Sequence, residues 1–238
     1  MTAAWPEPNI DKLLAQADQA ASTNEWERAI SILEGAPDLV RVLDKRAFYL
    51  SQAKRYDEAC DTLAVLRQRE PANFLWQHMT GYQYYVQERY VEAVPWFVET
   101  FKLNRTHVRN VYRLAQSRRH QGELVRAQRA AAEVRRLWFA LAEPARQREA
   151  KTFAKASYLL GKLLADRDPR AAIEPLKDAA EHDPSDHDNH YLLGKTYRRL
   201  AGARGRNLGS GAGTSDKAEP RVHRAGVRGC AGRRRGVR

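Results

Sequence analysis

Small and large apolar residues recur along the first 200 residues with helical spacing. A small residue follows an apolar one by three positions and, in three of four copies, precedes a large apolar residue by four (Leu33, Leu63 and Phe97). Offsets of three, four and seven share one face of an α-helix. The small residue is Ala29, Ala59, Ala93 or Ala127. The last two intervals between these alanines are 34 residues each, and the first is 30. The chain is therefore predicted to repeat a helical unit.

A second set of small residues marks another helix in each unit. Its members are Ala17, Ala47, Gly81, Ala115, Gly161 and Gly194. Most are followed three residues later by an apolar side chain, namely Ala20, Leu50, Tyr84, Leu164 or Tyr197. Glycine inside a helix costs about 1 kcal/mol relative to alanine. Three glycines at one repeat position therefore indicate that two helices approach each other closely there.

Prolines and irregular spacings set the unit boundaries. Pro71 and Pro184 follow second helices and mark the ends of units. We place the units at residues 10–39, 40–73, 74–107, 108–143 and 154–186, followed by a single helix over 187–200. The second helix of the first unit is cut short at Pro37. About a dozen extra residues near 140–151 include Pro144, which can open a longer first helix.

The small residue near position eight, the Tyr-x-x-Ala motif, the following Phe or Leu and the terminal Pro resemble the tetratricopeptide repeat (TPR) family over residues 10–200. The third unit carries the most specific match, with Gly81, Tyr84, Tyr90, Ala93 and Phe97. The resemblance implies an all-α fold, a right-handed solenoid of helical hairpins with about five repeats and a closing helix. Three tyrosines are expected to pack in its core, namely Tyr84, Tyr90 and Tyr197.

The charge of the chain is concentrated at its C-terminal end. The formal net charge is +12, but residues 201–238 hold ten Lys or Arg against two acids, and residues 1–200 hold 31 against 27. Nine of the fourteen glycines also lie in 201–238, so this segment is predicted to be a disordered basic tail, and residues 1–9 a flexible N-terminus. Two interpretations stay open: the helix over 187–200 caps the solenoid, or the chain is a truncated or frame-shifted form of a longer protein.

Catalytic and metal-binding patterns are weak. Cys60 and Cys230 give neither a disulfide framework nor a metal-ligand spacing, and we find no Gly-rich phosphate loop and no nucleophile elbow. The densest group of potential ligands lies over residues 182–190, and we interpret it as turn and capping residues. We therefore predict a non-enzymatic protein without cofactor or metal. Neither a signal-peptide pattern nor a long apolar run is evident, so we expect a cytoplasmic protein.

The resemblance also implies a binding surface, because first helices of the family line a concave groove that holds a peptide. Carried onto this chain, the implied peptide-binding residues are Tyr82, Tyr85, Arg109, Tyr112, Arg113, Gln116, Arg119, Tyr158, Lys162, Tyr191, Lys195 and Arg198. Arg109 and Arg113 match a basic pair that clamps a terminal carboxylate in some members, whereas Phe48 and Met79 stand where that clamp has asparagine.

Arginine bonds carboxylates in bidentate fashion, and tyrosine adds apolar area with a polar tip. We therefore expect an interaction scaffold or adaptor whose partner is another protein, recognised through an acidic or C-terminal peptide. Two rival functions are an RNA-binding helical repeat and the TPR arm of a larger or truncated enzyme, such as a group-transfer enzyme. The RNA hypothesis rests on a basic ridge of Arg118, Arg119, Arg126, Arg129, Arg135 and Arg136. A third interpretation is that the groove positions are ordinary solvated helix faces.

Overall fold

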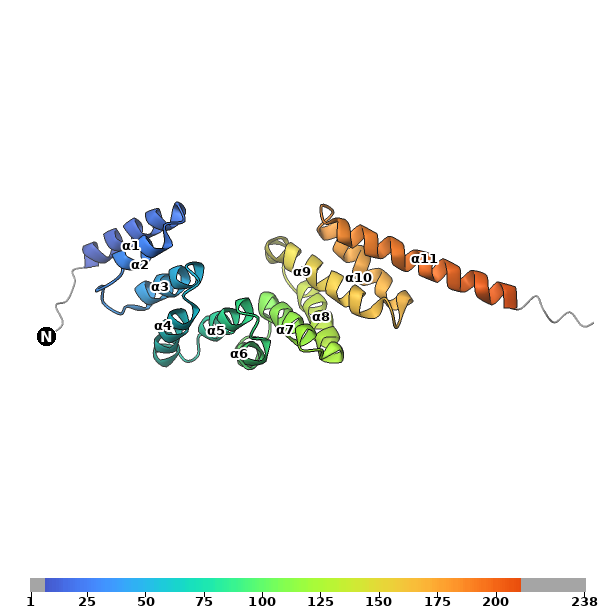
Figure 1. Cartoon of the computed structure of the whole chain (residues 1–238), viewed down its shortest axis with the longest axis horizontal. Coiled ribbons are helices and arrows are strands. Elements are labelled where there is room, and N and C mark those ends of the chain that lie inside the picture. The colour runs from blue at the N-terminus through green and yellow to red at the C-terminus, as the bar shows by residue number, and fades with distance from the viewer. Residues whose placement is uncertain (1–6, 211–238) are drawn as a thin grey trace, which may run out of the picture. The chain divides into compact units, whose positions relative to one another are not determined.

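The computed structural model describes residues 7–210, which form helices and no strand (Figure 1). The helices are α1 (Glu7–Ser22), α2 (Trp26–Ile32), α3 (Val40–Gln52), α4 (Tyr56–Arg69), α5 (Phe74–Val86), α6 (Tyr90–Leu103), α7 (Val108–His120), α8 (Leu124–Phe139), α9 (Glu143–Leu164), α10 (Pro169–His182) and α11 (His187–Ser210). Successive helices pair as α1 with α2, α3 with α4, and so on to α9 with α10. The predicted series of five helical hairpins followed by a further helix is confirmed.

The chain divides into two units, residues 1–200 and 201–238. The first unit contains all five hairpins and most of α11. Helix α1 begins at Glu7, inside the segment expected to be flexible, and α11 continues to Ser210 rather than ending at Leu200. The remainder of the two predicted terminal segments, residues 1–6 and 211–238, lies outside the described residues.

Each hairpin closes on a small residue of its first helix. A Cβ atom added at Gly81 would lie 2.9 Å from the ring of Phe97, and one added at Gly161 would lie 2.5 Å from Leu176 Cγ. Both partner side chains are fully buried and belong to the second helix of the same hairpin. Ala17, Ala47 and Ala115 occupy the same repeat position and are also fully buried. The close approach predicted from the small residues is therefore present, and it lets a large side chain fill the contact.

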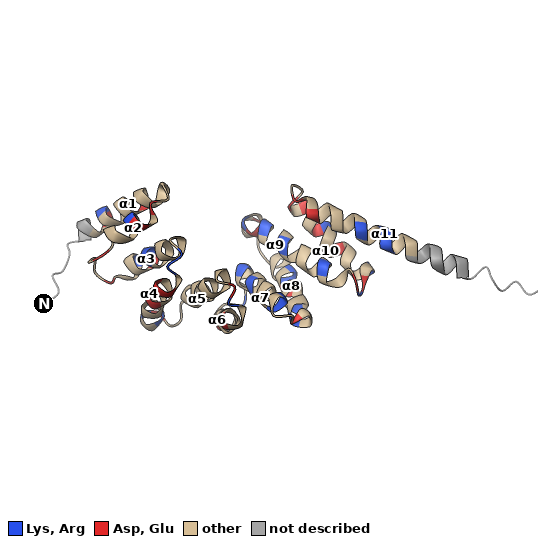
Figure 2. Cartoon of the chain, in the orientation of Figure 1, with Lys and Arg blue, Asp and Glu red and all other residues tan. Residues whose placement is uncertain are grey.

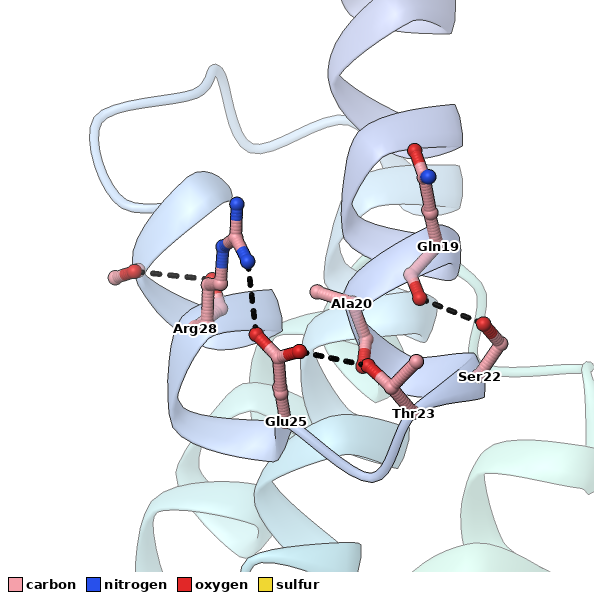
Figure 3. A network of polar contacts seen from close by, with 7 residues as sticks. Gln19, Ala20, Ser22, Thr23, Glu25 and Arg28 are labelled. Atoms are coloured by element: carbon pink, nitrogen blue, oxygen red, sulfur yellow. Dashed lines mark hydrogen bonds and ion pairs between the residues drawn. The ribbon is translucent and has the colours of Figure 1, made fainter.

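The turns inside the first four hairpins repeat one backbone conformation. Asn24, Lys54, Glu88 and Gly122 have φ between 59° and 77°, in the left-handed region. These four positions are spaced like the alanines of the second helices. Figure 3 shows the first of these turns, where Thr23 Oγ1 donates to Ala20 O and to Glu25 Oε1 at 2.9 Å each. Glu25 also accepts from Arg28, so side chains tie the end of α1 to the start of α2.

The extra residues near 140–151 lengthen α9 to 22 residues, with Pro144 in its first turn. This agrees with the longer first helix expected there. Trp138 of α8 stacks on Phe153 of α9 with ring centroids 3.9 Å apart, and His182 of α10 meets Trp138 edge-on at 4.8 Å. The insertion is therefore absorbed into the stack of helices.

The expectation that Tyr197 belongs to the core is wrong. Its side chain is 45% exposed, and nothing lies within 4 Å of a Cβ built on Gly194. Among the described residues no second helix follows α11, so this face lacks the cover that α6 gives Tyr84. Tyr84 and Tyr90 are partly buried. Tyr90 also stacks on His120 at 4.3 Å.

Two histidines pack between α5 and the start of α7. The rings of His78 and His107 lie 4.6 Å apart, and His78 Nδ1 lies 3.1 Å from Asn110 Oδ1. Burial, reinforced by His107 and nearby arginines, lowers the pKa of His78 to about 4, and burial lowers the pKa of His107 as well. His78 is therefore neutral at pH 7, which avoids a buried charge at this helix contact.

We predict opposite effects for one substitution at two equivalent glycines. Gly161→Ala places a methyl group against Leu176, and we expect a net loss of roughly 1 kcal/mol or more because overpacking outweighs the gain in helix propensity. Gly194→Ala meets open space and should stabilise by roughly 0.5–1 kcal/mol. Thermal unfolding followed by circular dichroism compares the two. An unchanged or raised Tm for Gly161→Ala would contradict the packing account.

We also predict a pH dependence of stability that arises from His78. The unfolded chain binds a proton at this side chain near pH 6.5, whereas the folded chain resists protonation until about pH 4. The free energy of unfolding should therefore have its full value above pH 6.5. It should fall by on the order of 2 kcal/mol as the pH is lowered to 4. Urea unfolding of His78→Gln should show a weaker pH dependence than wild type, and the exposed His187→Gln serves as control. Equal pH dependence in all three proteins would exclude His78 as the source.

Candidate functional site

A cavity of about 480 Å³ lies among four first helices, α3, α5, α7 and α9. We call it the central cavity. Residues from each of the four helices line it: Phe48, Ser51, Gln52, His78, Met79, Tyr82, Gln83, Arg109, Tyr112, Arg113, Lys151, Thr152 and Lys155. Four first helices thus contribute to one shared cavity.

Arg113 is held in the central cavity by aromatic rings. Its guanidinium carbon lies 4.7 Å from the ring centre of Tyr85, 5.3 Å from that of Tyr82 and 5.8 Å from that of Tyr112. Its Nη1 donates to Gln116 Oε1 at 3.0 Å. Cation–π contacts of this kind attract the guanidinium to the ring faces. Arg113 is therefore positioned before any ligand arrives.

Gln116 joins the two helices that carry these tyrosines. Its Oε1 also accepts from Tyr85 Oη at 2.9 Å, and its Nε2 donates to Tyr112 Oη at 2.8 Å. Burial raises the pKa of Tyr112 to about 12, so its hydroxyl stays protonated at neutral pH. The amide therefore fixes the orientation of two tyrosines and one arginine at the same time.

The lining of the central cavity is cationic. Arg109, Arg113, Lys151 and Lys155 contribute to it, and no acidic residue is among its described lining residues. Figure 2 shows Lys and Arg on α7 and α9, the two helices that supply these groups. Arg109 Nε is bonded to Glu149 Oε1 at 3.0 Å, and the Glu149 side chain is only 20% exposed. One of the four cations is therefore already neutralised, whereas the other three form no ion pair within the described part of the chain.

A buried acceptor also lines the central cavity. Gln83 is 1% exposed, and its Oε1 has no hydrogen-bond partner among the described residues. A buried carbonyl oxygen without a donor costs roughly 1–3 kcal/mol. This oxygen is therefore enclosed in the cavity wall beside the cations.

A second cavity of about 200 Å³ shares Tyr112 and Lys155 with the central cavity. Gln116, Arg119, Tyr158 and Lys162 of α7 and α9 line it, together with Asp183 and Asp186 from the segment between α10 and α11. Arg119 Nε is buried without a partner in the described structure. A third cavity, of about 150 Å³, shares Lys162 and includes Lys195, Thr196 and Arg199. The three cavities therefore follow one another along the first helices.

Nine of the twelve predicted binding residues line these cavities: Tyr82, Arg109, Tyr112, Arg113, Gln116, Arg119, Tyr158, Lys162 and Lys195. Tyr85 stands behind the lining and contacts Arg113 and Gln116. Tyr191 and Arg198 are exposed on α11 and line none of the three cavities.

Sequence reasoning did not predict Gln83, Glu149, Lys151 or Thr152 at the site. The last three belong to the extra residues and helix extension of α9, which have no counterpart in the other repeats. A signal was present, since residues 151, 155, 158 and 162 follow helical spacing. Extending that face backwards from Tyr158 would have found Lys151.

Three of the six arginines in the ridge considered for RNA are paired with acids. Arg126 bonds Glu123 at 2.7 Å, Arg136 bonds Glu133 at 2.6 Å, and Arg135 bonds Asp178. The same region therefore presents fewer free cations than the sequence suggested, and phosphate binding gains no support from it.

Other kinds of site have little basis in residues 10–202. Within this range no three side chains of His, Cys, Asp or Glu converge as metal ligands would. His182 instead packs against Trp138 and Phe153. No helix in the described structure combines the length and hydropathy required to cross a bilayer.

Comparison with known proteins identifies the fold. No family model matches the sequence, and no curated protein is significantly similar to it. Among solved structures, a MamA RS-1 double mutant is 16% identical with a TM-score of 0.62, covering 76% of this chain and 98% of its own. YrrB, described as a TPR protein with an unusual peptide-binding site, is 20% identical with a TM-score of 0.55, covering 75% and 89%.

A third structure, TTC0263 from Thermus thermophilus, is described as a thermophilic TPR protein. It is 14% identical with a TM-score of 0.53, covering 79% of this chain and 98% of its own. These likenesses agree with the repeat spacing, the helix hairpins and the small-residue contacts. The chain therefore has the fold of tetratricopeptide repeat proteins.

Proposed function

We propose that the chain is a non-enzymatic interaction scaffold whose first-helix cavities bind an acidic peptide segment of another protein. The observation that carries the proposal is the central cavity, in which cations and aromatic rings meet without a lining carboxylate. Ligand pockets combine apolar walls with a few convergent polar groups, and this cavity has both. YrrB is described as having a peptide-binding site and has a similar fold. This likeness supports a peptide as the ligand.

The geometry favours a carboxylate close to Arg113. Three rings and Gln116 hold its guanidinium, so little side-chain entropy remains to be lost when a ligand binds. Lys151 and Lys155 lie on the α9 side of the same cavity and add positive potential. An acidic side chain or a C-terminal carboxylate could each use this arrangement.

The neighbouring groups suit the rest of a peptide. Met79 and Phe48 offer apolar contact to a side chain. Continuity into the second cavity, through Tyr112 and Lys155, gives room for an extended segment. We place this activity in the cytoplasm and assign it no cofactor.

The two arginines of the central cavity, Arg109 and Arg113, are not equally available to a ligand. Its ion pair with Glu149 must be broken or shared before it can bond a ligand carboxylate. Glu149 therefore acts as an internal competitor, and Arg113 is the better placed of the two arginines for the first contact.

Charge reversal at Arg113 provides the test. Fluorescein-labelled nonapeptides with Asp or Glu around a central Leu or Tyr, ending in a free carboxylate, are titrated by fluorescence anisotropy. Arg113→Glu should weaken binding by about ten- to a hundredfold, because a charged hydrogen bond is replaced by repulsion. Arg170→Glu, an equal charge change at an exposed position of α10, should leave affinity unchanged.

Two further peptide sets complete the experiment. Amidated forms of the same peptides separate a terminal carboxylate from acidic side chains as the recognised group, and Lys-substituted forms should not bind. Equal affinity of wild type and Arg113→Glu for the acidic set would reject the proposed site. If wild type and Arg170→Glu both bind single-stranded RNA tightly, and the affinity falls steeply as salt is added, the nucleic-acid alternative would be favoured.

A further inference from the structure

One helix face in the described structure lacks the partner that its equivalents have. Positions four, eight and eleven of each first helix face the second helix of the same hairpin. In α3 these are Leu43, Ala47 and Leu50, all buried, and in the other four complete hairpins the same positions are buried or half-buried. In α11 the equivalent residues are His190, Gly194 and Tyr197, and all three are exposed. We call these three residues the α11 stripe.

The complete hairpins show what covers such a stripe. At Gly81 the space is filled by Phe97 of α6, and at Gly161 by Leu176 of α10. Both second helices place an alanine four residues before the filling side chain, at Ala93 and Ala172, each fully buried. Gly194 has open space in the same place. The α11 stripe therefore leaves room at Gly194 for a large apolar side chain from another helix.

The interface that α11 already makes continues up to this stripe. Leu192 and Leu193 pack against Ala165, Ala172 and Leu176 of the fifth hairpin, which fixes the side of α11 that adjoins the stripe. Asn189 adds a hydrogen bond from its Nδ2 to Ala179 O at 3.1 Å. A helix laid on the stripe would thus extend an ordered stack.

Charge beside the stripe selects the occupant. Arg198 is exposed on α11 next to the stripe and forms no ion pair within the described part of the chain, whereas Arg199 bonds Asp166 and Lys195 lines the third cavity. A helix with acidic residues flanking its apolar face would complement the unpaired guanidinium of Arg198. A second α11 would bring like charges together, which disfavours self-association through this face.

We propose that the α11 stripe is a docking surface for an amphipathic, acidic helix of a partner protein. The partner helix carries a small residue followed four positions later by Phe or Leu, and the large side chain enters the space above Gly194. Tyr197 then packs on it as Tyr84 packs beside Phe97 and Ala93. This surface is distinct from the central cavity, so the two proposals stand or fall separately.

Helix α6 provides a defined probe, because α5 and α11 share both Gly and Tyr at the equivalent positions. A fluorescein-labelled peptide of residues 88–104 is titrated with the full-length chain by fluorescence anisotropy. We expect the peptide to bind the wild-type chain. Its affinity should fall at least about tenfold in Gly194→Leu, whose side chain fills the space above residue 194. Asp188→Leu, at an exposed position of α11 outside the stripe, should bind like wild type. Phe97→Ala in the peptide should abolish binding, and Glu99→Ala should not.

Three results would overturn the proposal. The first is equal affinity of wild type and Gly194→Leu for the peptide, or no binding to either. The second is a wild-type dimer, detected by analytical ultracentrifugation, that Gly194→Leu dissociates, since a second copy would then occupy the stripe. The third is hydrogen-exchange protection of residues 211–238 that disappears in Gly194→Leu, since the chain's own terminal segment would then cover it. Circular dichroism of Gly194→Leu checks that its helix content matches wild type.

Discussion

The structure depends on one contact that every complete hairpin repeats. A residue without a side chain, or with only a methyl group, lets the second helix approach the first, as Phe97 does at Gly81 and Leu176 at Gly161. Burying a large apolar side chain stabilises by about 1.5–3 kcal/mol. Five such contacts, each local in sequence, make the stack possible. Glycine is needed at Gly81 and Gly161 because a methyl group there would lie less than 3 Å from Phe97 or Leu176, whereas the contacts at Ala17, Ala47 and Ala115 accommodate a methyl group.

This contact also determines where a ligand can bind. Once the second helices take up the apolar side of each first helix, the remaining side of α3, α5, α7 and α9 is left to line the central cavity. Its cations and rings come from helices that are distant in sequence and adjacent in the stack. Gln116 then links Tyr85, Tyr112 and Arg113 across two hairpins, so that the binding groups are ordered by neighbours rather than by their own helix.

The extension of α9 shows how an irregularity in a repeat can become part of a site. The extra residues keep helical spacing and carry Glu149, Lys151 and Thr152 to the edge of the central cavity. Lys151 strengthens its positive charge, and Glu149 neutralises Arg109. The balance between these two effects is specific to this chain, because no other repeat contains the insertion.

The helices, the five hairpins and the small-residue contacts could be predicted from the sequence, because they depend on local spacing. That spacing repeats every 30 to 34 residues through the fourth hairpin and after 45 residues at the fifth. Nine side chains that line the cavities could be named in advance as well, because the resemblance to the TPR family implied which positions of each first helix face the groove. The packing of helices against one another was needed to show that Gln83 Oε1 lacks a partner among the described residues, that Glu149 bonds Arg109 and that Tyr197 is exposed. Each of these depends on which atoms of another helix lie within a few ångströms, and repeat spacing carries no information about such contacts.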